Sequence, residues 1–220
     1  MEPWQEIACA KTSSGDDLVL RERAGVFEIR CNGWDLMSSR AHASEARMAR
    51  EALALLGPRP APRVLIGGLG MGFTLRAALD AAPAGARIAV AELVPEIVVW
   101  NRGPLARLAG RPLDDARAAV RIGDVAEAMG EGGPWDAILL DTDNGPGAVM
   151  LARNAGLYAR DGLLAARAAL SHGGVLALWS ADRSADFEAL LAAEGFDWRV
   201  IETPAAAGRP TPLHALYFVR

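Results

Sequence analysis

Cysteine and lysine are nearly absent from this sequence, and each scarcity excludes a class of protein. The two cysteines, Cys9 and Cys31, are too few and too far apart for a disulfide framework or a zinc cluster. We expect both to be small buried hydrophobic side chains in a reducing compartment. Lys11 is the only lysine among 23 basic residues, and the arginines form no basic run. With a net charge of −4, the chain has no electrostatic footprint for nucleic acid or for an anionic membrane.

Long hydrophobic runs are also missing. Arginine or glycine interrupts every apolar stretch well before the roughly 18 residues that a membrane span requires. The opening "MEPWQEIACA" has neither the basic nor the apolar region of a signal peptide. A hydrophobic content of 51% and a charged content of 23% over 220 residues are typical of a globular protein of one domain with a small appendage. We therefore expect a soluble cytoplasmic protein.

The first part of the chain differs in pattern from the rest. Short, partly alternating runs at 17–23 and 26–33 are joined by Ala24 and Gly25, which predicts a β-hairpin. Residues 43–57 then show apolar residues at helical spacing, and the pattern ends at a glycine followed by a proline. The sequence thus predicts two regions: a hairpin with a linker helix over 1–57, and an α/β domain that binds a nucleoside over 58–220.

From residue 63 onward, strand patterns and helix patterns alternate, which indicates a parallel sheet covered by helices on both faces. Strands are expected at 63–68, 87–93, 118–124, 135–141, 173–181, 197–203 and 214–220. Helices are expected at 73–81, 95–103, 124–130, 162–171 and 184–195. The last two strands are joined without a helix, which suits an antiparallel final strand. The predicted fold is α/β, a doubly wound, Rossmann-like, seven-stranded sheet with an antiparallel last strand, as in class I methyltransferases.

A glycine-rich turn follows the first strand of this sheet. Gly68, Gly70 and Gly72 stand between a strand and a helix, where a backbone without Cβ atoms can approach a ligand. The dinucleotide pattern G-x-G-x-x-G fails at Phe73, and the Walker pattern fails because the turn has no lysine. The remaining spacing, G-x-G-x-G, is usual for ligands of the S-adenosylmethionine kind.

Three carboxylates end the next three predicted strands. Glu92 lies where a carboxylate can accept both ribose hydroxyls, Asp124 where it can accept from an adenine amino group, and Asp141 ends the fourth strand. Each of them alone could simply cap the following helix. Together, beside the glycine turn, they favour a nucleoside pocket.

These segments resemble the spermidine synthase (polyamine aminopropyltransferase) family. "GLGMGFTLR" is similar to the family's G-G-G-D-G-G-x-x-R turn, and "VAELVPEIV" to its V-E-x-D-x-x-V segment. "RIGDVAEAM" is similar to its x-x-G-D-x-x-x-x-L segment, and "WDAILLDTDNGPG" to its Y-D-x-I-x-x-D-x-x-D-P-x-G-P segment. The resemblance covers roughly residues 63–179, with a fainter similarity in the hairpin at "CNGWDLMSS".

The resemblance implies roles for individual residues. Glu92 falls on the carboxylate that binds the ribose, and Asp124, followed by Val125, on the aspartate beside the adenine. Asp141 falls on the aspartate that deprotonates the attacking amine. The glycines fall on the turn that holds the ligand. Members of the family usually associate through their hairpins and sheet faces, so the resemblance also implies a homodimer.

The residues with which the family handles the amine are replaced. The acid of its glycine turn corresponds to Met71, the Y-H-E segment becomes "ASE" with Ala43 and Ser44, and the glutamine after the hairpin corresponds to Leu36 or its neighbour. The second aspartate of D-x-x-D becomes Asn144, with Asp143 one step away. Burying an ammonium group without a charged partner costs several kcal/mol. Losing the acid at Met71 therefore favours intact S-adenosylmethionine, or uncharged methylthioadenosine, over decarboxylated S-adenosylmethionine.

Three functions remain open from the sequence. The first is a small-molecule methyltransferase that uses S-adenosylmethionine, with Asp141 or Asp143 as general base or as the carboxylate that orients the acceptor. The second is aminopropyl transfer from decarboxylated S-adenosylmethionine. The third is a non-catalytic domain that binds a nucleoside or a protein partner. A methyltransferase of nucleic-acid bases is disfavoured because "DTDNGPG" offers no aromatic to stack a base.

The three histidines complete the candidates. His42, His172 and His214 are isolated and lack the spacing of metal ligands, so we expect no metal. The layout of the resembled family would place His42 near the mouth of the pocket. The alternative, which we favour, is a residue at the start of a helix beside Ser44 as the cap.

Overall fold

The N-terminal region folds into a four-stranded antiparallel sheet. The computed structural model describes residues 2–12, 15–142, 144–149, 152–206, 208 and 213–220. The strands lie in chain order: β1 (Gln5–Lys11), β2 (Asp17–Arg23), β3 (Val26–Cys31) and β4 (Trp34–Ser38). The expected hairpin is β2 and β3, which turn through Ala24 and Gly25, both at positive φ. Strands β1 and β4 extend this hairpin on either side.

The second sheet has the topology that the sequence predicts. Its order is β10-β11-β9-β8-β5-β6-β7, and β11 pairs antiparallel with both of its neighbours. The strands are β5 (Arg63–Gly67), β6 (Arg87–Glu92), β7 (Ala118–Ile122), β8 (Trp135–Leu140), β9 (Leu170–Ser180), β10 (Trp198–Pro204) and β11 (Leu213–Val219). From β5 the chain adds β6 and β7 on one side of the sheet. From β8 it adds β9, β10 and β11 on the other side. The switch point, where ligands bind in such sheets, therefore lies between β5 and β8.

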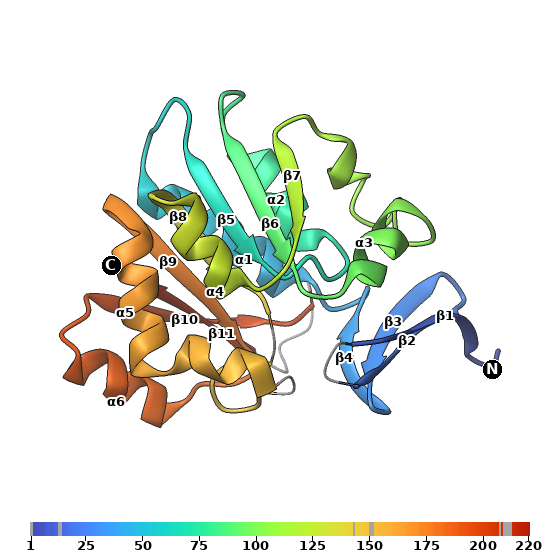
Figure 1. Cartoon of the computed structure of the whole chain (residues 1–220). Helices are drawn as coiled ribbons and strands as arrows, with labels where there is room; N and C mark the ends of the chain where they lie inside the picture. Colours follow the sequence, from blue (N-terminus) through green and yellow to red (C-terminus); the bar gives the residue numbers. More distant parts are fainter. Residues whose placement is uncertain (1, 13–14, 143, 150–151, 207, 209–212) are drawn as a thin grey trace.

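Helices cover both faces of this sheet (Figure 1). The helices are α1 (Ala43–Leu56), α2 (Phe73–Ala81), α3 (Pro95–Arg102), α4 (Val125–Gly132), α5 (Arg160–Ala169) and α6 (Ala185–Ala193), with short 3-10 turns at Pro112–Asp114 and Ala152–Tyr158. Val64 and Ile66 of β5 pack into a core with α1, α2 and α3, whereas Leu65 packs into a core with α4, α5 and α6. This alternation is the period of two that a strand buried on both faces requires. No helix in the described ranges is long and apolar enough to cross a membrane.

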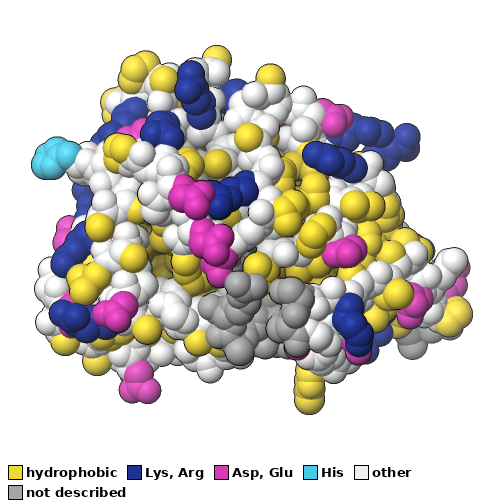
Figure 2. Space-filling model, viewed as in Figure 1, with side chains coloured by type: hydrophobic (Ala, Val, Ile, Leu, Met, Phe, Trp, Pro, Cys, Tyr) yellow, Lys and Arg dark blue, Asp and Glu magenta, His cyan; other side chains and the backbone are white. Residues whose placement is uncertain are grey.

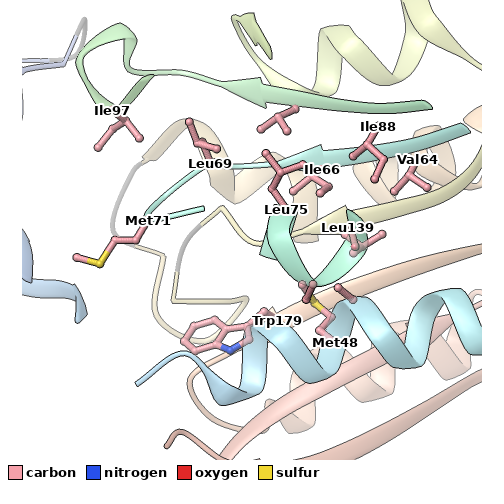
Figure 3. Packing of buried hydrophobic residues seen from close by; sticks show 14 of the residues in the cluster. Met48, Val64, Ile66, Leu69, Met71, Leu75, Ile88, Ile97, Leu139 and Trp179 are labelled. Carbon is pink, nitrogen blue, oxygen red and sulfur yellow. The ribbon is translucent and has the colours of Figure 1, made fainter. Parts of the chain in front are cut away.

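The core extends to the carboxyl ends of the strands. Figure 3 shows Val64, Ile66 and Ile88 along the sheet, with Leu69 and Met71 at its carboxyl end. The N-terminal sheet lies beside this end (Figure 1). On the surface, acidic and basic side chains are interspersed, and hydrophobic side chains gather around α3 and the adjoining N-terminal sheet (Figure 2). The two sheets therefore meet where the topology places a ligand.

One expectation about the cysteines is wrong. Cys31 is buried, but Cys9 is exposed. In β1, Ala8 and Ala10 are partly buried and Cys9 between them points to the opposite, solvent-facing side. An edge strand of a sheet with one covered face exposes every second side chain, whatever its polarity.

Candidate functional site

The glycine turn joins the ends of three strands. Gly68 has φ +87°, and its N–H donates to the carbonyl of Ala91 at 2.9 Å. A Cβ atom on Gly68 would lie 2.3 Å from the carbonyl oxygen of Asp141. Any side chain there would thus push the turn away from the end of β8, and glycine is required by both conformation and space. Gly72, at φ +83°, is the residue that precedes helix α2.

Beside this turn lies a cavity, which we call the Glu92 cavity. The Glu92 carboxylate is 7% exposed and accepts the backbone N–H groups of Leu69 and Val94, each at 2.8 Å. Burial raises the pKa of Glu92, and the backbone donors oppose that shift. The cavity is lined by Leu18, Leu36, Met37, Gly68, Gly70, Ala91, Glu92, Leu93, Val94, Ile97, Gly123, Asp124, Val125, Asp141, Thr142 and Asn154.

The side chain of Asp124 both caps a helix and lines the Glu92 cavity. Its Oδ1 accepts from the backbone N–H of Ala126 at 2.9 Å, so it caps α4. It also lines the Glu92 cavity, next to Val125. The capping role and the ligand role that the sequence left as alternatives are therefore compatible in one side chain.

A second cavity adjoins the first, and we call it the Glu45 cavity. Leu36, Met37, Gly70, Asp141 and Thr142 line both cavities. The remaining lining residues are Ser38, Glu45, Leu69, Met71, Phe73, Asn144 and Trp179. The carboxyl group at the boundary between the two cavities is that of Asp141.

Two carboxyl groups, Glu45 and Asp141, face the Glu45 cavity. Burial raises the pKa of Asp141 to about 6, and a hydrogen bond of 2.5 Å from Thr74 Oγ1 opposes the shift. Burial, followed by repulsion from Asp141, raises the pKa of Glu45 to about 8, and a hydrogen bond with Ser44 opposes it. At neutral pH, Asp141 is thus mainly ionised and Glu45 mainly protonated. The pair holds one negative charge and has capacity for a cation.

The start of helix α1 differs from expectation. His42, not Ser44, is the N-cap residue, and its side chain makes no capping hydrogen bond. The imidazole of His42 instead stacks on Phe73, with ring centroids 4.0 Å apart. Because Phe73 lines the Glu45 cavity, His42 contacts the wall of that cavity from outside its lining. Ser44 is in the first turn of α1, fully buried, where Trp179 Nε1 donates to its Oγ at 3.0 Å.

The structure brings most of the expected site residues together. Gly68, Gly70, Glu92, Asp124, Val125 and Asp141 line the Glu92 cavity, and Met71 lines the Glu45 cavity. Gly72 lines neither cavity and serves the start of α2. Asp143 lies outside the described residues.

The sequence reasoning missed Glu45, although a signal was present. Glu45 occupies the position of the glutamate in the Y-H-E segment. Only the first two positions of that segment differ from the family, and the glutamate is kept. Met37, Thr142 and Thr74 were also missed. Their hydrogen bonds and contacts depend on how distant segments pack, which no local motif specifies.

Comparisons with known proteins support the fold. No protein-family model and no curated protein matches the chain by sequence. A spermidine synthase solved in complex with the transition state analogue AdoDATO is 20% identical, with a TM-score of 0.75 over 97% of this chain and 71% of the other. The spermidine synthase from Thermotoga maritima is also 20% identical, with a TM-score of 0.76 over 97% of this chain and 72% of the other. A probable spermidine synthase from Corynebacterium glutamicum is 15% identical, with a TM-score of 0.66 over 100% of this chain and 80% of the other. The chain therefore shares the fold of these spermidine synthases.

Proposed function

We propose that this chain transfers an alkyl group from an adenosyl sulfonium compound to an amine, and that aminopropyl transfer from decarboxylated S-adenosylmethionine fits its site best. The observation that carries the proposal is the pair Glu45 and Asp141 in a cavity that adjoins the Glu92 cavity. Among the described lining residues these acids have no basic neighbour, and such acids suit a cationic substrate. The sequence favoured methyl transfer because Met71 replaces an acid, but Glu45 supplies an acid from another element.

The Glu92 cavity fits the nucleoside part of such a donor. Backbone donors hold the Glu92 carboxylate in place, and its remaining lone pairs can accept ribose hydroxyls. Asp124 lies in the same cavity and can accept from an adenine amino group. The donor itself supplies a sulfonium, which is already a good leaving group. The neighbour solved with AdoDATO supports this choice of ligand.

The Glu45 cavity fits the acceptor amine. An amine attacks only through a free lone pair, so it must first lose the proton of its ammonium form. Asp141 stands at the boundary of the two cavities, where it can orient that amine and accept its proton as the new bond forms. Leu36, Met37 and Trp179 line the cavity with apolar surface that suits the carbon chain of a diamine.

Methyl transfer from intact S-adenosylmethionine is the second candidate. Met71 is buried, lines the Glu45 cavity, and stands where the resembled family carries an acid. Without that acid, the carboxylate of intact S-adenosylmethionine meets less repulsion. The two candidates differ in the donor and share the roles of Glu92 and Asp141.

Mass spectrometry of reaction products tests the proposal. The purified chain would be incubated with putrescine and either decarboxylated S-adenosylmethionine or S-adenosylmethionine. We expect spermidine and methylthioadenosine from the first mixture. Methylated amine from the second mixture would instead establish the second candidate. A non-catalytic domain would give no product in either mixture.

Two further measurements sharpen this test. A donor at about 100 times its dissociation constant stabilises the fold by roughly 2.7 kcal/mol, which raises the melting temperature by about 5–10 °C. Glu45→Gln should lower kcat/KM for the amine about 100-fold while this thermal shift is kept. Glu6→Gln, at an exposed site on β1, is the matched control and should change neither. Absence of both product and thermal shift with every donor would refute the proposal.

A further inference from the structure

One buried hydroxyl connects Glu45 to a histidine on a distant strand. Ser44 Oγ lies 2.5 Å from Glu45 Oε2, 2.9 Å from His214 Nδ1 and 3.0 Å from Trp179 Nε1. Ser44 is completely buried, so no solvent competes for these bonds. His214 belongs to β11 and is only partly buried, and its ring also meets the Trp179 ring edge-on at 4.6 Å between centroids. The Glu45 cavity is therefore joined by hydrogen bonds to a side chain outside its lining.

The valence of the hydroxyl restricts how these bonds are arranged. A serine hydroxyl has one hydrogen to donate and two lone pairs to accept with, and an indole N–H can only donate. Trp179 therefore occupies one lone pair of Ser44. One hydrogen and one lone pair remain for Glu45 and His214 together. If Ser44 donates to one of them, it must accept from the other.

Two arrangements satisfy every partner when the proton of protonated Glu45 is on Oε2, the oxygen that contacts Ser44. In the first, ionised Glu45 accepts from Ser44, and His214 donates its Nδ1–H to Ser44. In the second, protonated Glu45 donates to Ser44, and Ser44 donates to a bare Nδ1 of His214, whose proton is then on Nε2. The two arrangements require opposite tautomers of the neutral imidazole.

We propose that Ser44 couples the protonation of Glu45 to the tautomer of His214, so that Ser44 and His214 act as positioning residues for the acid of the Glu45 cavity. The coupling follows from the three contacts of Ser44 and needs no ligand. Its consequence for the reaction rests on the proposed function. Ser44 replaces the histidine of the Y-H-E segment, and His214 stands at no position to which the resemblance assigned a role.

The surrounding charges favour the second arrangement at neutral pH. Burial and then Asp141 raise the pKa of Glu45 to about 8, so this group is mainly protonated. Burial lowers the pKa of His214, and Asp182, which follows β9, opposes that effect. The imidazole is therefore mainly neutral, with its proton on Nε2. Above about pH 8 Glu45 loses its proton, and Ser44 must turn its hydrogen from His214 to Glu45.

This coupling provides a route for the proton of the acceptor. An ammonium group in the Glu45 cavity favours ionised Glu45. The proton of Glu45 then passes to Ser44 as the proton of Ser44 passes to His214 Nδ1, and the imidazolium releases its Nε2 proton to solvent. Glu45 can now accept one proton from the ammonium, which leaves a free amine. One proton is lost by the ammonium and one is released at His214, while Glu45 ends protonated as it began. The cycle closes when His214 takes a proton at Nε2 and loses its Nδ1 proton by exchange with solvent, as Ser44 turns its hydrogen back to Nδ1.

Nitrogen NMR of the imidazole rings tests the coupling without any substrate. The ¹⁵N shifts of Nδ1 and Nε2 identify the tautomer, and a His214→Gln variant assigns the signals. We expect His214 to change from the Nε2–H to the Nδ1–H form as pH rises from 7 to 10, with a midpoint near 8. The signals of His42 and His172 serve as internal references, which the His214→Gln variant should retain. Glu45→Gln should abolish the change, because its amide does not titrate.

Ser44 variants separate coupling from packing. Ser44→Ala should uncouple His214 from Glu45, so that its tautomer no longer changes near pH 8. Ser44→Thr keeps the hydroxyl and should restore the change. If Ser44→Ala does not fold, the Glu45→Gln comparison decides alone. An unchanged tautomer of His214 across this range in the wild-type chain would overturn the proposal.

Activity measurements distinguish this inference from the proposed function. If aminopropyl or methyl transfer is detected, Ser44→Ala should lower kcat about 10-fold and move the pH profile, with KM for the sulfonium donor unchanged. Ser44→Thr should recover most of this loss. If the tautomer changes as expected but no transfer occurs, the coupling stands and the proposed function fails. If transfer occurs but the tautomer of His214 does not change with pH, the proposed function stands and the coupling fails.

Discussion

At the scale of single residues, the acidity of Asp141 depends on one buried hydroxyl. Thr74 Oγ1 donates to Asp141 Oδ2 at 2.5 Å, and Thr74 is 2% exposed. This bond stabilises the ionised form and holds the pKa of Asp141 at about 6 against its burial. Thr74→Val removes the donor and keeps the shape, so we expect the pKa of Asp141 to rise by about one unit.

The pH dependence of kcat in the transfer assay would measure this change. The acidic limb, where Asp141 becomes protonated and cannot accept the amine proton, should move to higher pH in Thr74→Val. Thr74→Ser keeps the hydroxyl and is the matched control. Its acidic limb should lie at the same pH as that of the wild-type chain. An acidic limb that is unmoved in Thr74→Val would show that Asp141 is not the titrating base.

Residues of the site differ in how far the sequence predicts them. Glu92, Asp124 and Asp141 could be placed together because carboxyl ends of parallel strands share one edge of a sheet. Glu45 comes from the first turn of a helix that precedes the sheet in the chain, and only tertiary packing sets it beside Asp141. The acid lost at Met71 is therefore offset by a residue that no local motif connects to it.

At the scale of elements, an alanine in the glycine turn should be destabilising for a steric reason in addition to a conformational one. Gly68→Ala introduces a Cβ at 2.3 Å from a backbone oxygen of Asp141. Gly25→Ala is the matched control, because Gly25 also has positive φ but nothing lies within 4 Å of the added Cβ. The left-handed conformation alone costs an alanine about 1–2 kcal/mol.

Thermal melting separates the two effects. We expect Gly25→Ala to lower the melting temperature by about 3 °C and Gly68→Ala by about twice as much or more, with loss of the donor-induced thermal shift only in Gly68→Ala. Equal losses in the two variants would mean that the turn relaxes without disturbing the end of β8.

The elements themselves were predictable to different degrees. Strands of the larger sheet are apolar on both faces, as in β5, where Val64 and Leu65 enter opposite cores. Strands β1 and β4 lie at the edges of the small sheet and leave many side chains exposed. Exposed edge strands carry a weak alternation of hydrophobicity, so their sequences gave no signal comparable to that of the hairpin between them.

At the scale of the whole molecule, the site belongs to both sheets. Leu36 and Met37 of β4 line both cavities, whose other residues come mainly from the carboxyl end of the larger sheet, with Glu45 from α1. A Cβ atom on Gly70 would approach Met37 Sδ to 3.2 Å, so the small sheet packs directly on the glycine turn. The way two sheets pack together depends on the fit of many side chains and could not be predicted from local patterns.

This shared burial makes the stability of the whole chain depend on pH. Glu45 has a pKa of about 8 in the folded protein, above its ordinary value near 4.5. Between these two values the unfolded chain binds fewer protons than the folded chain, so the free energy of unfolding falls as pH rises. The stabilising contribution is present below the lower pKa and is lost as pH rises through 8.

Glu45→Gln removes this dependence, because the amide stays neutral in both states. We expect the variant and the wild-type chain to have similar stability near pH 5, and the variant to become progressively more stable than the wild-type chain as pH rises toward 9. Urea unfolding at a series of pH values would measure the difference. Glu6→Gln, exposed on β1, controls for the loss of a charge and should follow the wild-type curve. Parallel curves for Glu45→Gln and the wild-type chain from pH 5 to 9 would show that Glu45 is ionised in the fold and that the acid pair carries two charges at neutral pH.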